Sequence, residues 1–283
     1  VPGGITVRLR PEMTSGPRMV YFNGRPEYHE MGFVEHYLRP GDRFLDIGAN
    51  IGIFTLVAAK AVGAEGHVDA LECVPRTLTW LEEHVALNGV ADWVTIHRFA
   101  ASDREGTLQF RADRDGTNHI LAEGEQGSQV LEVPTHRLDD VFHMQRFALA
   151  KMDIEGAEPM ALAGSTLMLD AANPPVWILE LNGALHKYGW TEEQLAQWLS
   201  SRGYDLALYD ADQRSLSFPD RPWERGGGTC WPSRGGTGRR WRTGCGARGR
   251  APRGGGSTGP GRSSPRHWVA RSRRVPTRCR WGP

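Results

Sequence analysis

The segment from Phe44 to Gly52 reads FLDIGANIG, an apolar run that ends in Asp46 and continues into a turn with two glycines. Gly48 and Gly52 permit backbone angles and a close ligand approach that other residues disfavour. The spacing is D-x-G-x-N-x-G rather than the G-x-G-x-x-G of turns that bring bare backbone to a pyrophosphate. Because the side chains of Asp46 and Asn50 stand in this turn, it suits a cofactor without phosphates.

A second acid, Glu72, ends the next β-rich run, which begins near Val68. An acid in this position can bind both hydroxyls of an adenosine ribose. Each feature also has a plain structural explanation, since glycines can simply connect a strand to a helix and an acid can cap a helix. Their joint occurrence at the ends of two successive β-rich runs favours a nucleoside site.

Three further carboxylates, Asp153, Glu155 and Glu180, follow or end two later β-rich runs. Ligands of parallel sheets bind at the carboxyl ends of the strands, so these side chains are expected at one edge of the sheet. Strand alternation also places Lys151 on the same face as Asp153 and Glu155. The plain alternative is that Lys151 only pairs with Asp153. Glu155 and Glu158 would then merely favour the N-terminus of the next helix.

Other groups give weaker signals. His119, His136 and His186 could each act as a base, but a lone histidine is more often a surface or structural residue. Carboxylates bind hard cations, yet their spacing here defines no ligand set, so no metal is predicted. Cys73 has no histidine near it in the sequence, and we do not expect it to act as a nucleophile.

Together these segments resemble the FkbM family of class I S-adenosylmethionine-dependent methyltransferases. The matching segments are DIGANIG at 46–52 with Glu72, AASD at 100–103, LDD at 138–140, KMDIEGAE at 151–158 and ILE at 178–180. They stand in the family's order, and the resemblance covers about residues 30–218. One departure is Asn182, because many relatives have a histidine shortly after the acid that ends the fifth strand.

The resemblance implies an S-adenosylmethionine cofactor and assigns residues to it. Those that would line its methionine and ribose are Asp46, Gly48, Asn50 and Gly52. Glu72 would bind the ribose hydroxyls. Ser102 and Asp103 would lie at the adenine edge, although residues 103–106 could equally form a plain turn.

The resemblance also implies O-methyl transfer to a hydroxyl of a small molecule, either a sugar or a secondary metabolite. Methyl transfer from a sulfonium is a direct displacement, which needs the acceptor oxygen in line with the methyl group and a group that takes its proton. Asp153 is the candidate for acceptor positioning or for the general base, with Glu155 and Glu180 as supporting residues. The loops at 20–40 and 111–128 are expected to shape the acceptor pocket.

Short β-rich runs alternate with longer helical patterns from residue 41 onward. The predicted strands are 43–47, 67–73, 94–100, 148–154 and 176–181, with hairpin pairs at 107–110 and 130–134 and at 204–209 and 215–218. The predicted helices are 51–61, 76–87, 159–169 and 191–203. This alternation predicts an α/β fold with a Rossmann-like, doubly wound, mostly parallel sheet of about seven strands and a C-terminal antiparallel hairpin.

The composition divides the chain near residue 220. Positions 221–283 hold 16 arginines against one acid, Glu224, a net charge of +15, so positions 1–220 carry −14 within a chain of +1. The tail contains no Leu, Ile, Met, Phe or Tyr and cannot bury enough apolar surface to offset its ordering entropy. We therefore predict a lead-in at 1–40 on the substrate side, a methyltransferase domain at 41–220 and a disordered tail at 221–283.

The tail has an unusual origin in this interpretation. Its abundant Arg, Gly and Pro without Lys are typical of GC-rich coding DNA read out of frame, with a genuine disordered extension or a nucleic-acid arm as alternatives. A nucleic-acid partner is therefore disfavoured. The alternative functions are an inactive remnant whose frame is lost near residue 220 and a nucleotide-cofactor oxidoreductase, which Asn50 disfavours.

The remaining expectations concern location. The longest apolar run, 53–59, is too short to form a membrane helix. Before the tail, Cys73 is the one cysteine, which fits a reducing compartment, so a cytoplasmic location is predicted. The oligomeric state is not predicted.

Overall fold

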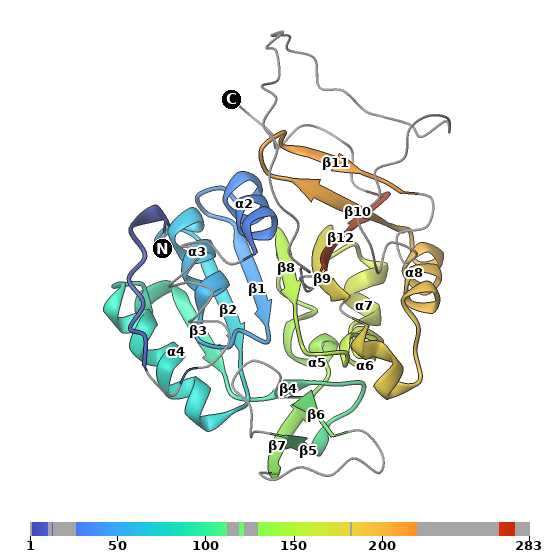
Figure 1. Cartoon of the computed structure of the whole chain (residues 1–283), viewed down its shortest axis with the longest axis horizontal. Coiled ribbons are helices and arrows are strands. Elements are labelled where there is room, and N and C mark those ends of the chain that lie inside the picture. The colour runs from blue at the N-terminus through green and yellow to red at the C-terminus, as the bar shows by residue number, and fades with distance from the viewer. Residues whose placement is uncertain are drawn as a thin grey trace, which may run out of the picture.

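The computed structural model describes residues 2–10, 13, 27–111, 119–121, 130–181, 183–219 and 266–274. Its centre is a sheet of eight strands in the order β11-β10-β12-β9-β8-β1-β2-β3 (Figure 1). These strands are β1 (Arg43–Ile47), β2 (His67–Leu71), β3 (Val94–His97), β8 (Leu149–Met152), β9 (Val176–Leu181), β10 (Tyr204–Asp210), β11 (Ser215–Ser217) and β12 (Arg266–Ser272). Five neighbouring strands pair in parallel, in the order β9-β8-β1-β2-β3. The strands β12, β10 and β11 form the antiparallel end. The predicted doubly wound fold with its closing hairpin is confirmed.

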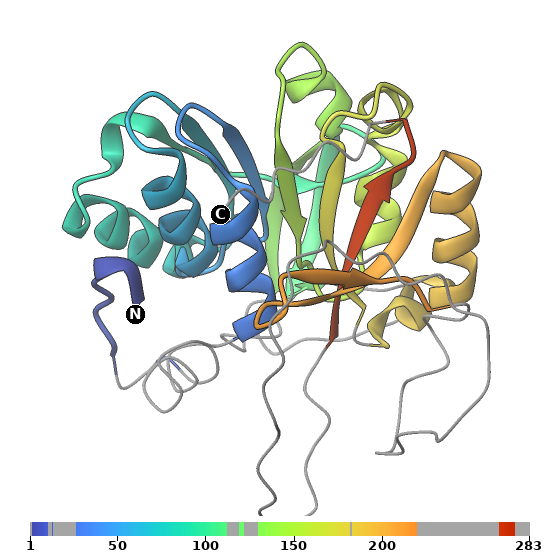
Figure 2. The same cartoon turned by 90° about the horizontal axis from the view of Figure 1, so that it is seen from above.

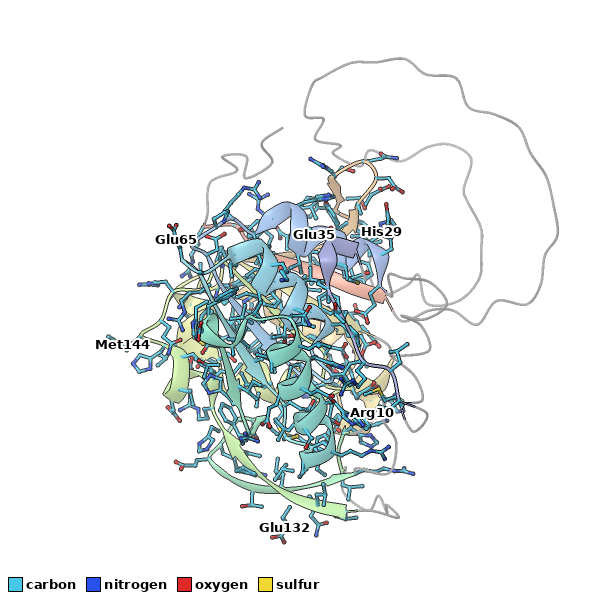
Figure 3. The ribbon with its side chains drawn as sticks, turned by 90° about the vertical axis from the view of Figure 1, so that its left-hand side faces the viewer. Arg10, His29, Glu35, Glu65, Glu132 and Met144 are labelled. Atoms are coloured by element: carbon cyan, nitrogen blue, oxygen red, sulfur yellow. The ribbon has the colours of Figure 1, made fainter. Side chains whose placement is uncertain are left out.

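Helices cover both faces of this sheet (Figure 2). On one face lie α2 (Tyr28–Tyr37), α3 (Ile53–Val62) and α4 (Pro75–Leu87), and α3 and α4 face the viewer in Figure 3. On the other face lie α5 (Leu138–Phe142), α6 (Glu158–Ala163), α7 (Thr166–Asp170) and α8 (Glu192–Ser201). Short 3-10 turns are η1 (Pro2–Gly4), η2 (Ala91–Trp93) and η3 (Ala184–Tyr188). Within the described residues, no helix is both long and apolar enough to cross a membrane.

Strand alternation decides which face each polar side chain reaches. Phe44 packs into the core beneath α2 and α3, and its neighbour Leu45 packs into the core on the opposite face. Asp46 therefore faces α3, where its carboxylate accepts a hydrogen bond from Thr55 at 2.6 Å. Lys151 on β8 lies directly beside Asp46 in the parallel register, so its side chain shares that face.

A second sheet covers the carboxyl-end edge of the parallel strands. It has the order β4-β7-β5-β6, formed by β4 (Ala100–Ala101), β5 (Gly106–Arg111), β6 (His119–Ile120) and β7 (Val130–His136). β5 and β7 pair as the predicted hairpin. Phe110 and Ile120 of this sheet pack with Val74 and Ala157, which follow β2 and β8. The loop region of the main sheet thus gains an apolar wall.

Two predicted elements divide differently. The strand predicted at 94–100 ends at His97, and Ala100 belongs to the second sheet. The helix predicted at 159–169 is two helices, α6 and α7, separated at Gly164. A Cβ at Gly164 would overlap the carbonyl oxygen of Ser102, so the break lets β4 approach the helical layer.

The prediction for the tail is wrong at one segment. Residues 221–283 were expected to contribute no element, yet β12 occupies the position between β9 and β10 and pairs with both (Figure 1). Trp268, Val269 and Ala270 are buried in the two main cores. A short run of apolar residues in an otherwise Arg- and Gly-rich segment is enough here, because the sheet itself supplies the neighbours that bury it. The rest of the tail, 221–265 and 275–283, lies outside the described residues.

Candidate functional site

The turn after β1 has the backbone that its glycines predict. Gly48, Asn50 and Gly52 have φ values of 82°, 51° and 91°, in the left-handed region. The N–H groups of Gly48 and Ala49 both donate to the carbonyl of Leu71, at 3.0 and 2.8 Å, which ties the turn to the end of β2. A non-glycine residue held at positive φ, as Asn50 is, costs about 1–3 kcal/mol, and such strain clusters at ligand sites.

Gly48 also brings this turn against the end of β8. A Cβ at this position would overlap the carbonyl oxygen of Asp153. The N–H of Asp153 donates to the carbonyl of Ile47 at 3.1 Å, so the ends of β1 and β8 are hydrogen-bonded next to the glycine. The turn predicted to bind the cofactor is therefore in direct backbone contact with Asp153, the residue predicted to position the methyl acceptor.

Glu72 organises the same turn from β2. Its carboxylate accepts three backbone hydrogen bonds, from Cys73 and Val74 at 2.8 Å each and from Asn50 at 3.0 Å. Burial raises the pKa of Glu72, and these three donors counteract part of the rise. Glu72 remains partly exposed, so its free lone pairs can accept hydrogen bonds from a ligand.

Asp46 is fully buried, and burial raises its pKa despite the nearby Lys151 ammonium. One carboxylate oxygen accepts from Thr55, and the other has no hydrogen-bond partner among the described residues. A buried acceptor without a partner is costly, and in a native structure it is often satisfied by a bound group.

The two predicted adenine-edge residues differ in exposure. Ser102 is fully buried, its N–H donates to His136 at 3.0 Å, and its hydroxyl donates to Asp103 at 3.2 Å. Asp103 is exposed. The turn that carries Asp103 lies where β4 leads into β5, beside the covering sheet, and its part in adenine binding stays a prediction.

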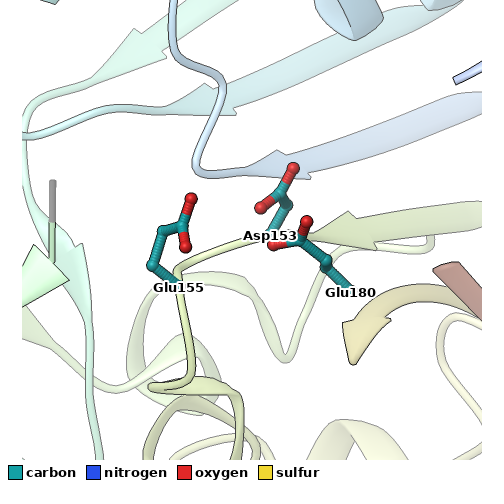
Figure 4. A group of neighbouring side chains, drawn as sticks. All are labelled: Asp153, Glu155 and Glu180. Atoms are coloured by element: carbon teal, nitrogen blue, oxygen red, sulfur yellow. The ribbon is translucent and has the colours of Figure 1, made fainter. Parts of the chain in front are cut away.

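The structure brings the three predicted catalytic carboxylates together at the ends of β8 and β9. Asp153, Glu155 and Glu180 each place a carboxylate oxygen within 4.8 Å of the others (Figure 4). Asp153 and Glu155 are half-buried and Glu180 is 6% exposed. Three carboxyl groups at this separation do not all ionise, because the repulsion between them is too large. The sequence predicts no metal here, and this stays a prediction.

Within this cluster, burial and the neighbouring acids favour the neutral form of Glu180. Burial raises the pKa of Glu180 well above its usual range, and the Asp153 carboxylate adds to the rise by its charge and by a hydrogen bond. This shift favours a protonated Glu180 that shares a hydrogen bond with Asp153. Asp153 also accepts a hydrogen bond from Lys151 at 2.7 Å.

The loop that carries Glu155 has a strained backbone and packs against η3. Glu155 has a φ of 57° and the next residue, Gly156, has a φ of 102°. A Cβ on Gly156 would lie 2.6 Å from the carbonyl oxygen of Ala184, so this loop packs closely on η3. Glu158, fully buried, accepts from the N–H of Ile154 at 3.0 Å, and burial raises its pKa to about 7. Glu158 was expected only to favour the helix end, although the spacing of KMDIEGAE could have revealed this second role.

The three candidate histidines lie on other elements than the carboxylates. His119 is buried on β6, His136 stacks edge-on against Phe99, and His186 is an exposed residue that bonds Gly183 within η3. Asn182 lies outside the described residues. Burial raises the pKa of the Cys73 thiol well above its usual range, which makes it a poor nucleophile.

A residue that sequence reasoning did not single out connects the wall to the site. The Tyr188 hydroxyl at the end of η3 donates to the carbonyl of Ile120 on β6 at 2.6 Å. Because η3 follows the Glu180 strand, this bond fixes the covering sheet beside the carboxylates. The signal for Tyr188 is absent from the sequence, since the two partners are 68 residues apart.

Comparison with known proteins agrees with this geometry. The family model described as the Methyltransferase FkbM domain matches residues 46–206, more than half of the chain. A ribosomal protein L11 methyltransferase from Syntrophomonas wolfei is 33% identical over 66 residues, which are 23% of this chain and 21% of that protein. The chain thus aligns with about a fifth of the length of that curated relative.

Solved structures with a similar fold are distant. A SAM-dependent O-methyltransferase from Thermotoga maritima is 12% identical with a TM-score of 0.44, covering 90% of this chain and 69% of that one. An O-methyltransferase from Bacillus cereus in complex with SAH is 13% identical with a TM-score of 0.41, covering 65% and 75%. The family match, together with the turn and carboxylates described above, places the chain in the FkbM methyltransferase family, with S-adenosylmethionine as its cofactor.

Proposed function

We propose that the chain transfers the methyl group of S-adenosylmethionine to a hydroxyl oxygen of a small molecule, a sugar or a secondary metabolite. The observation that supports this most is the backbone contact between Gly48 and Asp153. It joins the cofactor turn to a carboxylate that can take a hydroxyl proton, with no intervening layer. The O-methyltransferase names of distant structural relatives agree with this chemistry and describe those proteins only.

The residues at the β1 turn fit the cofactor. The partnerless buried oxygen of Asp46 suits a donor such as the methionine ammonium group, and the partly exposed Glu72 suits the ribose hydroxyls. Gly48 itself places no side chain in this space. When bound, the cofactor supplies an electrophilic methyl group on a sulfonium sulfur.

Asp153 has the central role in the chemistry that we propose. Its carboxylate would accept the proton of the acceptor hydroxyl as the oxygen–carbon bond forms and the carbon–sulfur bond breaks, leaving S-adenosylhomocysteine and the methyl ether. Glu180, as a neutral acid bonded to Asp153, would orient that carboxylate. Glu155, on its strained loop, would contact the acceptor. A carboxylate near the sulfonium also favours cofactor binding, which helps affinity more than rate.

The test uses the full chain with the cofactor and a panel of hydroxylated sugars and polyketides. Formation of S-adenosylhomocysteine together with an O-methylated product, identified by mass spectrometry and NMR, is the expected result. With the acceptor found, Asp153→Asn should lower turnover by about 10²–10⁴-fold, the range for general-base assistance. Affinity for S-adenosylhomocysteine should change little, because Asp46 and Glu72 remain. Methylation at nitrogen or carbon, or normal turnover in folded Asp153→Asn, would refute the proposal.

A further inference from the structure

Lys151 is a buried cation at the boundary between the two halves of the site. Its side chain is 3% exposed, and its ammonium nitrogen lies 2.7 Å from a carboxylate oxygen of Asp153, which is 21% exposed. The ammonium also stands over the ring of Phe54 on α3, 4.5 Å from the ring centroid. A buried lysine whose ammonium both bonds a carboxylate and stands over an aromatic ring has little freedom, so the position of Asp153 is fixed with it.

The charged groups around Lys151 come from four elements. They are Asp46 at the end of β1, Asp153 after β8, Glu180 on β9 and Glu27 at the start of α2. Burial lowers the pKa of Lys151, but the carboxylates of Asp153, Glu27 and Asp46 outweigh burial and leave it above its ordinary value. The ammonium therefore stays charged, and it counters acids on both the cofactor side and the acceptor side.

Lys151 favours the ionised form of Asp153, whereas the acids around Asp153 favour its protonated form. The carboxyl groups of Glu155 and Glu180 lie close to Asp153 and repel a negative charge on it when they are ionised. The fully buried Asp46 lies on the same face as Lys151. Among these acids, the bonded ammonium favours an ionised Asp153. An ion pair of this kind, half-buried and hydrogen-bonded, is sensitive to the loss of one partner.

We propose that Lys151 is a positioning residue of the methyl-transfer site, which holds the Asp153 carboxylate ionised and oriented toward the acceptor and thereby sets the pH range of the reaction. This inference rests on the proposed function, since it gives Asp153 the part of proton acceptor. Lys151 itself transfers no proton. Its role is to keep the lone pair of Asp153 available while Glu180 retains the shared proton.

The central variant is Lys151→Met, which keeps a long unbranched side chain and removes the charge. Turnover is measured against pH with the acceptor identified above, alongside the affinity for S-adenosylhomocysteine and the melting temperature. The acid limb of the turnover profile should move to higher pH by about 1–3 units, the effect of removing an opposite charge at this distance. Much of the lost turnover should therefore return in alkaline buffer.

Two further variants separate positioning from a structural role. Lys60→Met removes an exposed lysine of α3 that bonds only the carbonyl of Asn88 among the contacts described, and its profile should coincide with that of the parent chain. The double variant Lys151→Met with Asp153→Asn should be no slower than Asp153→Asn alone, because Lys151 acts through Asp153. An unmoved acid limb, an equal loss at every pH, or additive losses in the double variant would overturn the proposal.

A second measurement, by infrared spectroscopy, does not depend on methyl transfer. Infrared difference spectra of the full chain at neutral pH report protonated carboxyl groups through a carbonyl stretch that carboxylates lack. Lys151→Met should gain one such signal relative to the parent chain, and neither Lys60→Met nor the double variant should gain it. If no hydroxyl acceptor is found but this signal appears, the proposed function fails and the assignment of Lys151 stands. If Lys151→Met does not fold, Lys151→Gln is measured in the same way, and absence of the signal there refutes the assignment.

Discussion

At the scale of single residues, we propose that the Glu72 carboxylate serves both the fold and the ligand. Its three backbone hydrogen bonds hold the β1 turn in place, and in this proposal its partly exposed carboxylate also accepts from the ribose hydroxyls. We expect Glu72→Ala to weaken S-adenosylhomocysteine binding by the value of charge-assisted hydrogen bonds, about 1.5–3 kcal/mol, and also to lower the melting temperature. Calorimetry measures the first effect.

Glu72→Gln is the control for that prediction, because the amide keeps the shape and one accepting oxygen. It should recover part of the lost stability but little of the affinity. Unchanged affinity in Glu72→Ala would remove this residue from the cofactor site.

Glu180 gives the site a predictable response to pH. Its pKa is raised by burial and by Asp153, so the folded chain keeps the proton where the unfolded chain, with the ordinary value of 4.5, has released it. Above pH 4.5 the unfolded state then binds fewer protons, so this contribution to stability is complete below pH 4.5 and declines steadily as pH rises from there toward the raised pKa of Glu180. Glu180→Gln carries no such proton.

We therefore expect the melting temperature of Glu180→Gln, relative to the parent chain, to rise steadily between pH 5 and pH 9, and scanning calorimetry at several pH values measures it. The matched control is Glu193→Gln on the exposed face of α8, for which the difference should stay flat. A flat difference for Glu180→Gln as well would mean that Glu180 is ionised in the folded chain.

At the scale of elements, the β1 turn can be tested by its close approach to β8. Gly48 and Gly41 both have positive φ, 82° and 85°, so the backbone disfavours alanine at each. Only at Gly48 would the added Cβ overlap another residue, the carbonyl of Asp153, while at Gly41 it meets nothing within 4 Å. Gly48→Ala should consequently lose much more stability and cofactor affinity than Gly41→Ala, as thermal unfolding with and without S-adenosylhomocysteine would reveal. Equal losses would mean that the turn and β8 are not in contact.

The sequence predicted the structure of this turn because its signals are local. The glycines, Asp46 and Glu72 lie within one strand-turn-helix-strand unit, where spacing along the chain determines spacing in the fold. The Asp153 and Glu180 strands are also predictable, because parallel strand ends meet at one edge. The bond from Tyr188 to Ile120 and the division of the helix at Gly164 were not predictable, since both depend on contacts between residues far apart in sequence.

At the scale of the whole molecule, the composition of the tail is misleading because it conceals the strand β12. A net charge of +15 and the absence of Leu, Ile and Phe describe the tail as an average. The average conceals the run from Trp268 to Ala270, which alternates between the two cores once β9 and β10 flank it. A strand needs only a few apolar residues when both its edges and both its faces are provided by the rest of the fold.

The last prediction follows from that position. Deleting residues 220–283 removes β12. The strand β9, which carries Glu180, and the strand β10 then each lose a hydrogen-bonded neighbour. Burying side chains such as Trp268 and Val269 stabilises by roughly 1.5–3 kcal/mol each, a large share of the roughly 5–15 kcal/mol typical of a domain. We expect the deletion to lower the melting temperature by roughly 10 °C or more. Deleting only 275–283, after β12, should leave it unchanged, and Val269→Asp in the full chain should mimic the long deletion. Equal melting temperatures for the parent chain and the 1–219 fragment would show instead that β12 contributes nothing to the stability of the sheet.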